Sequence, residues 1–136
     1  MCVESDDLGK LVLRLTLGVL MLFHGAHKIL TGIDPIRGMI AAHHLPDFVA
    51  YFVYLGEVVA PALIVLGLFT RLGGLLVVID MIVAIVLVHT GMLMGTDPKT
   101  GGYVLELQAF YLFGALAATL LGAGAISVGG KDGTLN

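Results

Sequence analysis

The chain has 136 residues, of which 58% are hydrophobic and only 12% are charged, and its formal net charge is -3. Soluble domains are usually about half apolar and about a quarter charged, so this composition excludes an ordinary soluble domain and favours a protein dissolved in a lipid bilayer. The small net charge without a run of like charges argues against nucleic acid as a partner, and the single cysteine, Cys2, excludes an internal disulfide or dithiol relay.

Four segments are apolar and long enough to cross a membrane as helices. About 20 apolar residues span a hydrocarbon core of about 30 Å, and lipid-exposed backbone must be hydrogen-bonded within its own segment. The first segment is too long for the apolar region of a signal peptide, so we expect it to be retained. The sequence predicts an all-α integral membrane four-helix bundle, a single transmembrane domain over residues 1–136, with helices at 11–30, 48–69, 72–94 and 103–126.

The connection between the first two helices predicts a short helix of its own. Asp34 before Pro35 is typical of an N-cap followed by a proline at the first helical position. The apolar residues that follow share one face, so we expect residues 35–44 to form a helix in the membrane interface, with a structureless loop as the alternative.

The second and third helices are joined by Thr70 and Arg71 alone, which predicts a tight antiparallel hairpin. Four spans place both termini on one side, and Arg71 in the shortest loop favours cytoplasmic termini. We therefore expect a multi-pass protein of the cytoplasmic (inner) membrane of a bacterium or archaeon.

Ionisable side chains inside the predicted helices are costly and usually face the interior of a bundle. At about 1.5 Å of rise per residue, five of them fall in the half away from the termini, and Glu57 lies near mid-depth. Arg14 and Asp80 fall in the half nearer the termini. The sequence therefore predicts one polar cluster in the outer half, formed with Glu57 by His24, His27, Lys28, His89 and Glu106.

These groups also have structural interpretations. Arg14 can snorkel to the nearer interface or form a bridge with Asp80, and Lys28 and His27 can be interfacial. A carboxylate at mid-depth needs a cation, a proton or a metal, so the cluster is either a functional site or a polar network that locks the helices. Four residues after Glu57, a proline removes the N–H that its carbonyl would accept, which predicts a kink.

Imidazoles, buried carboxylates and tyrosines are typical of proton-coupled redox chemistry. A quinone head group needs hydrogen-bond donors for its carbonyl oxygens and a route for protons, which histidine and a carboxylic acid can supply. Proton relays in transporters use the same residue types. We assign as candidate catalytic residues His24, Glu57, His89 and Glu106.

The candidate residues for binding a quinone cofactor are Lys28, Tyr54, Tyr103 and Phe110, because the aromatic rings could border its head group. A metal ion is the second option, since imidazoles and carboxylates form mixed nitrogen and oxygen sites. Two histidines on different helices could also ligate a haem. The candidate metal ligands are His24, His27 and His89.

Four stretches between about residues 8 and 126 together resemble the DoxX family of small four-helix membrane proteins. They are LRLTLGVLMLFHGAHKI, YLGEVVAPALIVLGLFTRLGG, DMIVAIVLVH and ELQAFYLFGALAATLLGAG. The individual matches are Arg14, His24–Gly25 with Lys28, Gly56–Glu57, Gly67, Thr70–Arg71, Met81, Ala84, His89 and Glu106. The tail SVGGKDG departs from the family pattern, in which the last helix ends with a serine and a short acidic exit.

The resemblance implies membrane redox chemistry. One group of the family is a subunit of thiosulfate:quinone oxidoreductase, and others are linked to quinone detoxification or oxidative-stress complexes. This chain looks too small for a complete thiosulfate-oxidising enzyme and offers only Cys2 as a thiol. We therefore expect a quinone-interacting membrane subunit, and whether it is itself an enzyme stays open.

The expected partners are the lipid bilayer, other membrane or peripheral redox subunits and a second copy of the chain in a homo-oligomer. Three alternatives stay open at this stage. They are a non-catalytic assembly or stability subunit, a metal- or haem-binding protein, and a proton-coupled transporter of a small solute.

Overall fold

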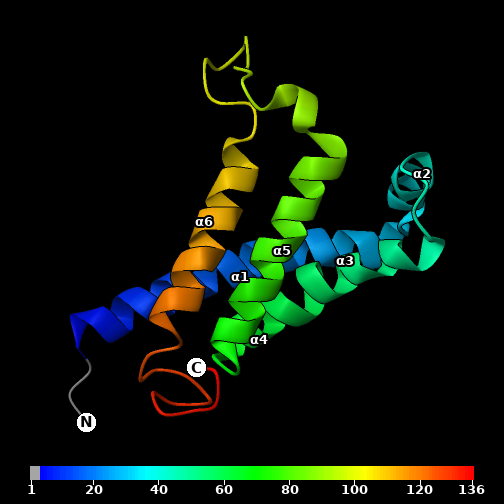
Figure 1. The fold of residues 1–136 in the computed structure, drawn as a ribbon. Helices are drawn as coiled ribbons and strands as arrows, with labels where there is room; N and C mark the ends of the chain where they lie inside the picture. Colours follow the sequence, from blue (N-terminus) through cyan, green and yellow to red (C-terminus); the bar gives the residue numbers. More distant parts are fainter. Residues whose placement is uncertain (1–3) are drawn as a thin grey trace.

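The computed structural model describes residues 4–136, and over these residues the chain is helical and contains no β-strand (Figure 1). The predicted all-α class is confirmed. Three helical stretches are long and apolar enough to cross a membrane, Ser5–Thr31, Asp47–Leu66 and Thr70–Val88, and a shorter apolar helix covers Glu106–Leu121. The α-helices are α1 (Ser5–Thr31), α2 (Asp34–Ala42), α3 (Phe52–Tyr54), α4 (Ala60–Leu66), α5 (Thr70–Val88) and α6 (Glu106–Leu121).

The stretch Asp47–Leu66, hereafter the second span, changes helix type along its length. It begins as a 3₁₀ turn, η1 (Asp47–Tyr51), passes through α3 into a π-helical turn, η2 (Leu55–Val59), and ends as α4. Pro61 has no N–H, so an α-helical ladder cannot continue unchanged here, and the wider π turn absorbs the mismatch. The irregularity that the sequence predicts beside Glu57 is therefore present as a π turn that contains Glu57.

The helices α5 and α6 are shorter than the sequence predicts. The helix α5 ends at Val88 rather than at residue 94, because His89 leaves the helical conformation and a short 3₁₀ turn, η3 (Thr90–Met92), follows. The helix α6 begins at Glu106 and ends at Leu121, where Gly122 adopts a positive φ of 75°. Residues 93–105 thus form a polar, glycine-containing loop that leaves one end of the α5–α6 pair (Figure 1).

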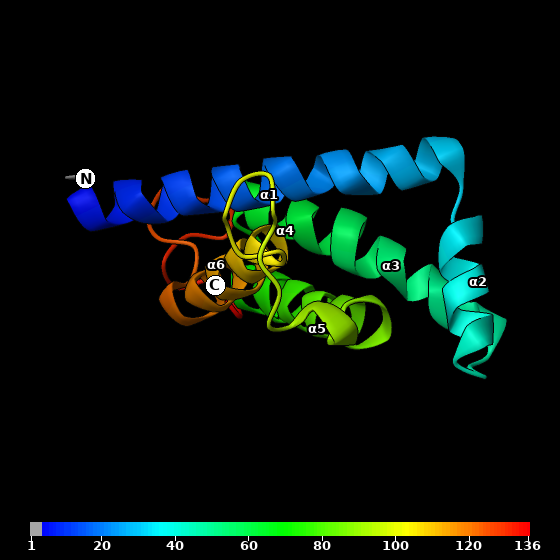
Figure 2. The same cartoon turned by 90° about the horizontal axis from the view of Figure 1, so that it is seen from above.

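Two helix pairs meet near the chain termini and diverge away from them. The helices α5 and α6 lie side by side, as do α1 and α4, and the two pairs point in different directions (Figures 1 and 2). The core lies where the pairs cross, and it is built from Leu17, Met21, Ala60, Ile64, Val77, Met81, Tyr111, Ala115 and Ala118.

The segment after α6 folds back on α1 and is held by a buried arginine. The Arg14 guanidinium is 1% exposed and donates to the carbonyl oxygens of Ala123 at 2.5 Å and Ile126 at 3.0 Å. The predicted bridge between Arg14 and Asp80 is therefore wrong. The reason is that carbonyl groups beyond the end of α6 lack helical donors, and a guanidinium satisfies two of them at once.

An acidic group in the first turn of α1 fastens the same segment. The buried Asp7 carboxylate accepts from the N–H of Ala125 at 2.9 Å and forms an ion pair with the Lys131 ammonium at 3.2 Å. This hydrogen bond raises the pKa of Lys131 above its usual value, so the pair persists at neutral pH. The first turns of α1 and the segment after α6 consequently lie on one side of the molecule (Figure 1).

A glycine in α1 sets the distance between α1 and the second span. A Cβ atom on Gly25 would collide with the carbonyl oxygen of Glu57, and one on Gly18 would lie 2.9 Å from that of Pro61. Small residues of this kind let helix backbones touch in membranes. The carbonyl of Glu57 has no α-helical donor, because Pro61 lacks an N–H. The backbone of α1 thus covers this carbonyl.

We predict that Gly25→Ala lowers the stability of the protein in detergent by about 1–3 kcal/mol, because the methyl group meets backbone that cannot move aside. The matched control is Gly114→Ala in α6, where the nearest atom, in Leu17, lies at an uncrowded 3.6 Å. Thermal unfolding followed by circular dichroism measures both variants. Equal stability of the two variants would contradict this account of α1 packing.

Candidate functional site

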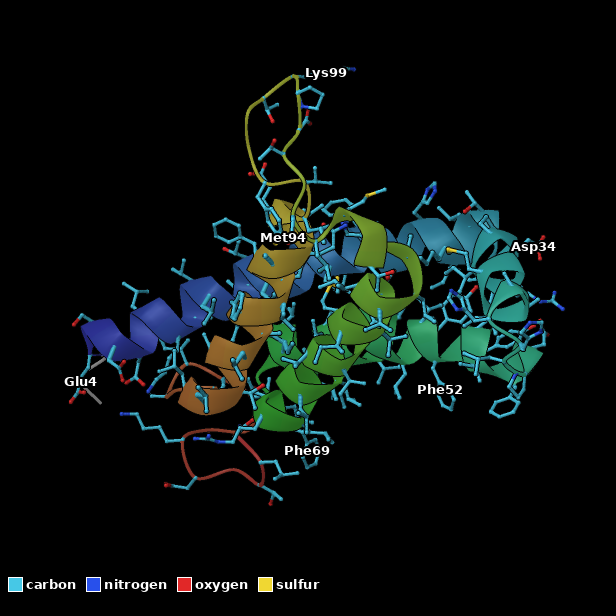
Figure 3. The ribbon with its side chains drawn as sticks, turned by 45° about the horizontal axis from the view of Figure 1, so that its top comes forward. Glu4, Asp34, Phe52, Phe69, Met94 and Lys99 are labelled. Carbon is cyan, nitrogen blue, oxygen red and sulfur yellow. The ribbon has the colours of Figure 1, made fainter. Side chains whose placement is uncertain are left out.

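A cavity of about 470 Å³ lies between α2, the second span and α5. Most of its lining is apolar, but Lys28, Glu57 and Asp80 contribute polar groups, and His89 contributes another. Asp80 lies in α5 and His89 directly follows its end, nine residues later, which separates them by about 13 Å along the helix axis. The cavity therefore has two polar regions joined by apolar walls. Figure 3 shows the side chains of the elements around it. Asp34 marks the start of α2 and Phe52 lies in the second span, on the opposite side of the view from Glu4.

An ion pair between α1 and the second span forms the first polar region. The Lys28 ammonium donates to Oε2 of Glu57, and the two side chains are only 23% and 10% exposed. The hydroxyl of Tyr54 donates to the backbone carbonyl of Lys28 at 3.2 Å and holds the end of α1 against the same span. The cation that a mid-depth carboxylate requires is thus Lys28, which does not snorkel outward.

Asp80 joins this region from α5, although the sequence prediction placed it elsewhere. A Cβ atom on Gly56 would lie 2.5 Å from Cβ of Asp80, so only a glycine in the π turn admits the side chain. The Oδ2 atom is buried and has no hydrogen-bond partner among residues 4–136. The sequence does contain a signal that Asp80 lies beside Glu57. Glu57 lies ten residues before Gly67 and Asp80 ten residues after Thr70, so the tight hairpin places them at equal depth.

His89 forms the second polar region at the C-terminal end of α5. Its Nε2 atom lies 3.4 Å from the amide nitrogen of Gln108 in α6, and its Nδ1 atom is buried without a partner in the part of the chain that the structure describes. The sequence analysis assigned His89 to the site but missed Gln108. An imidazole with one free buried nitrogen can accept or donate a hydrogen bond, depending on its tautomer.

Several predicted site residues lie outside the cavity. The ring of His24 is exposed and packs edge-on against Tyr111, with ring centroids 5.6 Å apart. Glu106 and Tyr103 line a smaller cavity in the 93–105 loop, and Phe110 is 82% exposed. Among the described residues, none of these groups forms a hydrogen bond or ion pair with Lys28 or Glu57, and their assigned roles stay predictions.

The histidines do not form a metal centre. Among residues 4–136, no three His, Cys, Asp or Glu side chains lie close enough together to hold a metal ion. The predicted set His24, His27 and His89 is consequently not assembled. The first two are exposed on α1, whereas His89 ends α5 beside Gln108.

The helix α2 covers one side of the cavity and is fixed by polar contacts at two points. The Arg37 guanidinium donates to both carboxylate oxygens of Asp47, at 2.7 and 3.0 Å, a bidentate arrangement. Nε2 of His43 lies 3.0 Å from the carbonyl oxygen of Leu87 in α5. A helix is present where the sequence predicts one, although Ile33 rather than Asp34 is its N-cap, and its apolar face contributes to the cavity lining.

Comparison with known proteins places the cavity within a recognised sequence unit. The DoxX family model matches residues 9–90, a range that includes every residue lining the cavity. A Bacillus subtilis (strain 168) protein with the name "Putative oxidoreductase CatD" is 32% identical over 85 residues. These residues make up 62% of this chain and 63% of that protein, so the chain matches less than two thirds of the relative. No solved structure matches the chain.

We predict that Lys28→Met destabilises the protein by about 3–5 kcal/mol, because it leaves the buried Glu57 carboxylate without a cation. The double variant Lys28→Met with Glu57→Gln should recover most of this loss. Arg37→Met, which breaks an exposed ion pair, is the control and should cost at most about 1 kcal/mol. Chemical denaturation in detergent provides the double-mutant cycle, and additive effects of the two substitutions would argue against the pair.

Proposed function

The chain belongs to the DoxX family, and on this premise we propose that it is a redox-associated integral membrane protein that binds a quinone in the cavity between α2, the second span and α5. The observation that carries the proposal is the composition of this cavity. It combines apolar walls with an ion pair, an unpartnered carboxyl oxygen and an unpartnered imidazole nitrogen. The name of the Bacillus relative also supports a redox role.

A quinone suits these walls in size and polarity. Small-molecule sites usually enclose about 300–1,000 Å³ and combine apolar lining with a few placed polar groups. A quinone head group is flat and uncharged, with carbonyl oxygens that accept hydrogen bonds. Its apolar tail partitions into lipid, so the ligand would reach the cavity from the bilayer without crossing water.

We assign one polar region to the head group and the apolar region to the tail. Near Lys28 and Asp80, a carbonyl oxygen would find donors. The side chains between that region and His89 are aliphatic, including Val83, Ala84 and Leu87, and would contact the tail. Glu57 would act on the ligand through Lys28, whose ammonium it holds in place.

The electrons for such a ligand would come from a second protein. Cys2 is the only thiol of the chain, so a dithiol donor would have to belong to a partner. We therefore propose that the chain is the quinone-binding subunit of a membrane oxidoreductase in a cytoplasmic membrane, with its termini on the cytoplasmic side.

We predict that Ala84→Phe, which fills the cavity, weakens binding of a water-soluble quinone analogue at least about tenfold. Val86→Phe places the same side chain on an exposed face of α5 and should leave binding unchanged. Isothermal titration calorimetry on the detergent-solubilised protein gives the dissociation constants. Absence of saturable binding by the wild type, or equal binding by both variants, would refute the quinone site.

A further inference from the structure

Asp80 differs from the other carboxylate of the cavity in having no partner. Glu57 is bonded to the Lys28 ammonium, whereas the buried Oδ2 atom of Asp80 is bonded to nothing in the described part of the chain. Buried polar atoms are normally satisfied, so an exception calls for an explanation such as a functional role or an ordered water or ion. The free oxygen belongs to a residue that lines the cavity.

The charges around Asp80 do not balance when it is ionised. Lys28 on α1 supplies one positive charge, while Glu57 on the π turn and Asp80 on α5 supply two negative charges. From α6, the nearby titratable group is Tyr111, against which His24 packs. Because the cavity walls next to this region are otherwise apolar, an unbalanced charge is costly. A proton on Asp80 removes the imbalance.

Beside this region, the hydroxyl of Tyr54 donates to the backbone carbonyl of Lys28, and two histidines contact other parts of the cavity walls. His89 sits about 13 Å along α5 from Asp80, beside Gln108. His43 follows the end of α2, and its Nε2 atom lies 3.0 Å from the carbonyl oxygen of Leu87, a residue that lines the cavity. Neither of these histidines touches the Lys28–Glu57 pair, so each can be tested separately.

We propose that Asp80 binds the quinone in its protonated form, with its hydroxyl donating a hydrogen bond to one quinone carbonyl oxygen. This inference rests on the quinone site proposed above and identifies the residue that recognises the head group. When Asp80 loses its proton, the donor is replaced by a negative oxygen that repels the carbonyl. Ligand affinity is therefore coupled to the protonation of Asp80, and it falls as the pH rises.

The test measures binding of the water-soluble quinone analogue to the detergent-solubilised full-length chain between pH 5.5 and 8.5. The wild type should bind about tenfold more weakly at the upper end of this range, because it loses one buried hydrogen bond and gains a repulsion. Asp80→Asn keeps an N–H donor and should bind with little dependence on pH. Asp80→Leu has no donor and should bind weakly throughout.

The control variant is His89→Gln, which removes the imidazole at the other end of the cavity. Its pH profile should keep the shape of the wild-type profile. If the pH dependence disappears in His89→Gln and persists in Asp80→Asn, the assignment to Asp80 is wrong, while the quinone site stands. A wild type that binds with equal affinity at every pH leads to the same conclusion.

Infrared spectroscopy of the wild type provides a second measurement that needs no variant. A protonated buried carboxyl gives a carbonyl stretch that shifts in heavy water, and the quinone analogue should shift it further. Absence of this band in the ligand-free protein at the pH of tightest binding would overturn the proposal. Failure of the wild type to bind the analogue at any pH would instead overturn the quinone site itself, so the two failures are distinguishable.

Discussion

The ion pair between Lys28 and Glu57 is the interaction on which the site depends, because it joins α1 to the second span where water is scarce. Three local features position it. Pro61 interrupts the helical ladder, the π turn rearranges the backbone around Glu57, and Gly25 lets α1 touch the freed carbonyl. An isolated charge in such surroundings is costly, so each partner keeps the other in place. The pair therefore fixes both the spacing of the helices and one wall of the cavity.

The cavity exists because the two helix pairs diverge while their crossing point stays tightly packed. The core residues at the crossing, among them Ile64, Val77 and Ala115, are almost completely buried. Beyond the crossing, α5 separates from the second span, and the gap between them is covered by α2. Gly56 admits Asp80 to the space beside the ion pair, which gives an otherwise apolar cavity a carboxyl group. The π turn thus contributes both to the packing of the helices and to the polar lining of the cavity.

The sequence predicted what depends on residues close together in the chain. Composition and segment length gave the helical class, the Asp34–Pro35 pair gave α2, and Pro61 gave the irregular turn. Depth along separate helices was less informative, because it assumed parallel spans of equal length. This assumption placed Glu106 with Glu57, although α6 diverges with α5 and begins beside a loop. It also paired Arg14 with Asp80, since a carbonyl partner beyond the end of α6 leaves no trace in the hydropathy pattern.

The extent of the family match separates two parts of the chain. Every residue that lines the cavity lies within residues 9–90, whereas α6 and the segment after it lie outside. The part of the chain after residue 90 still contacts the part that the family model matches. Tyr111 and Ala118 complete the core, and the carbonyl of Ala123 accepts a hydrogen bond from Arg14. We therefore regard α6 as the support that holds α5 at its angle to the second span. Because this angle opens the cavity, changes in α6 should alter affinity for the proposed quinone without contacting it, whereas changes near Lys28 should alter its recognition directly.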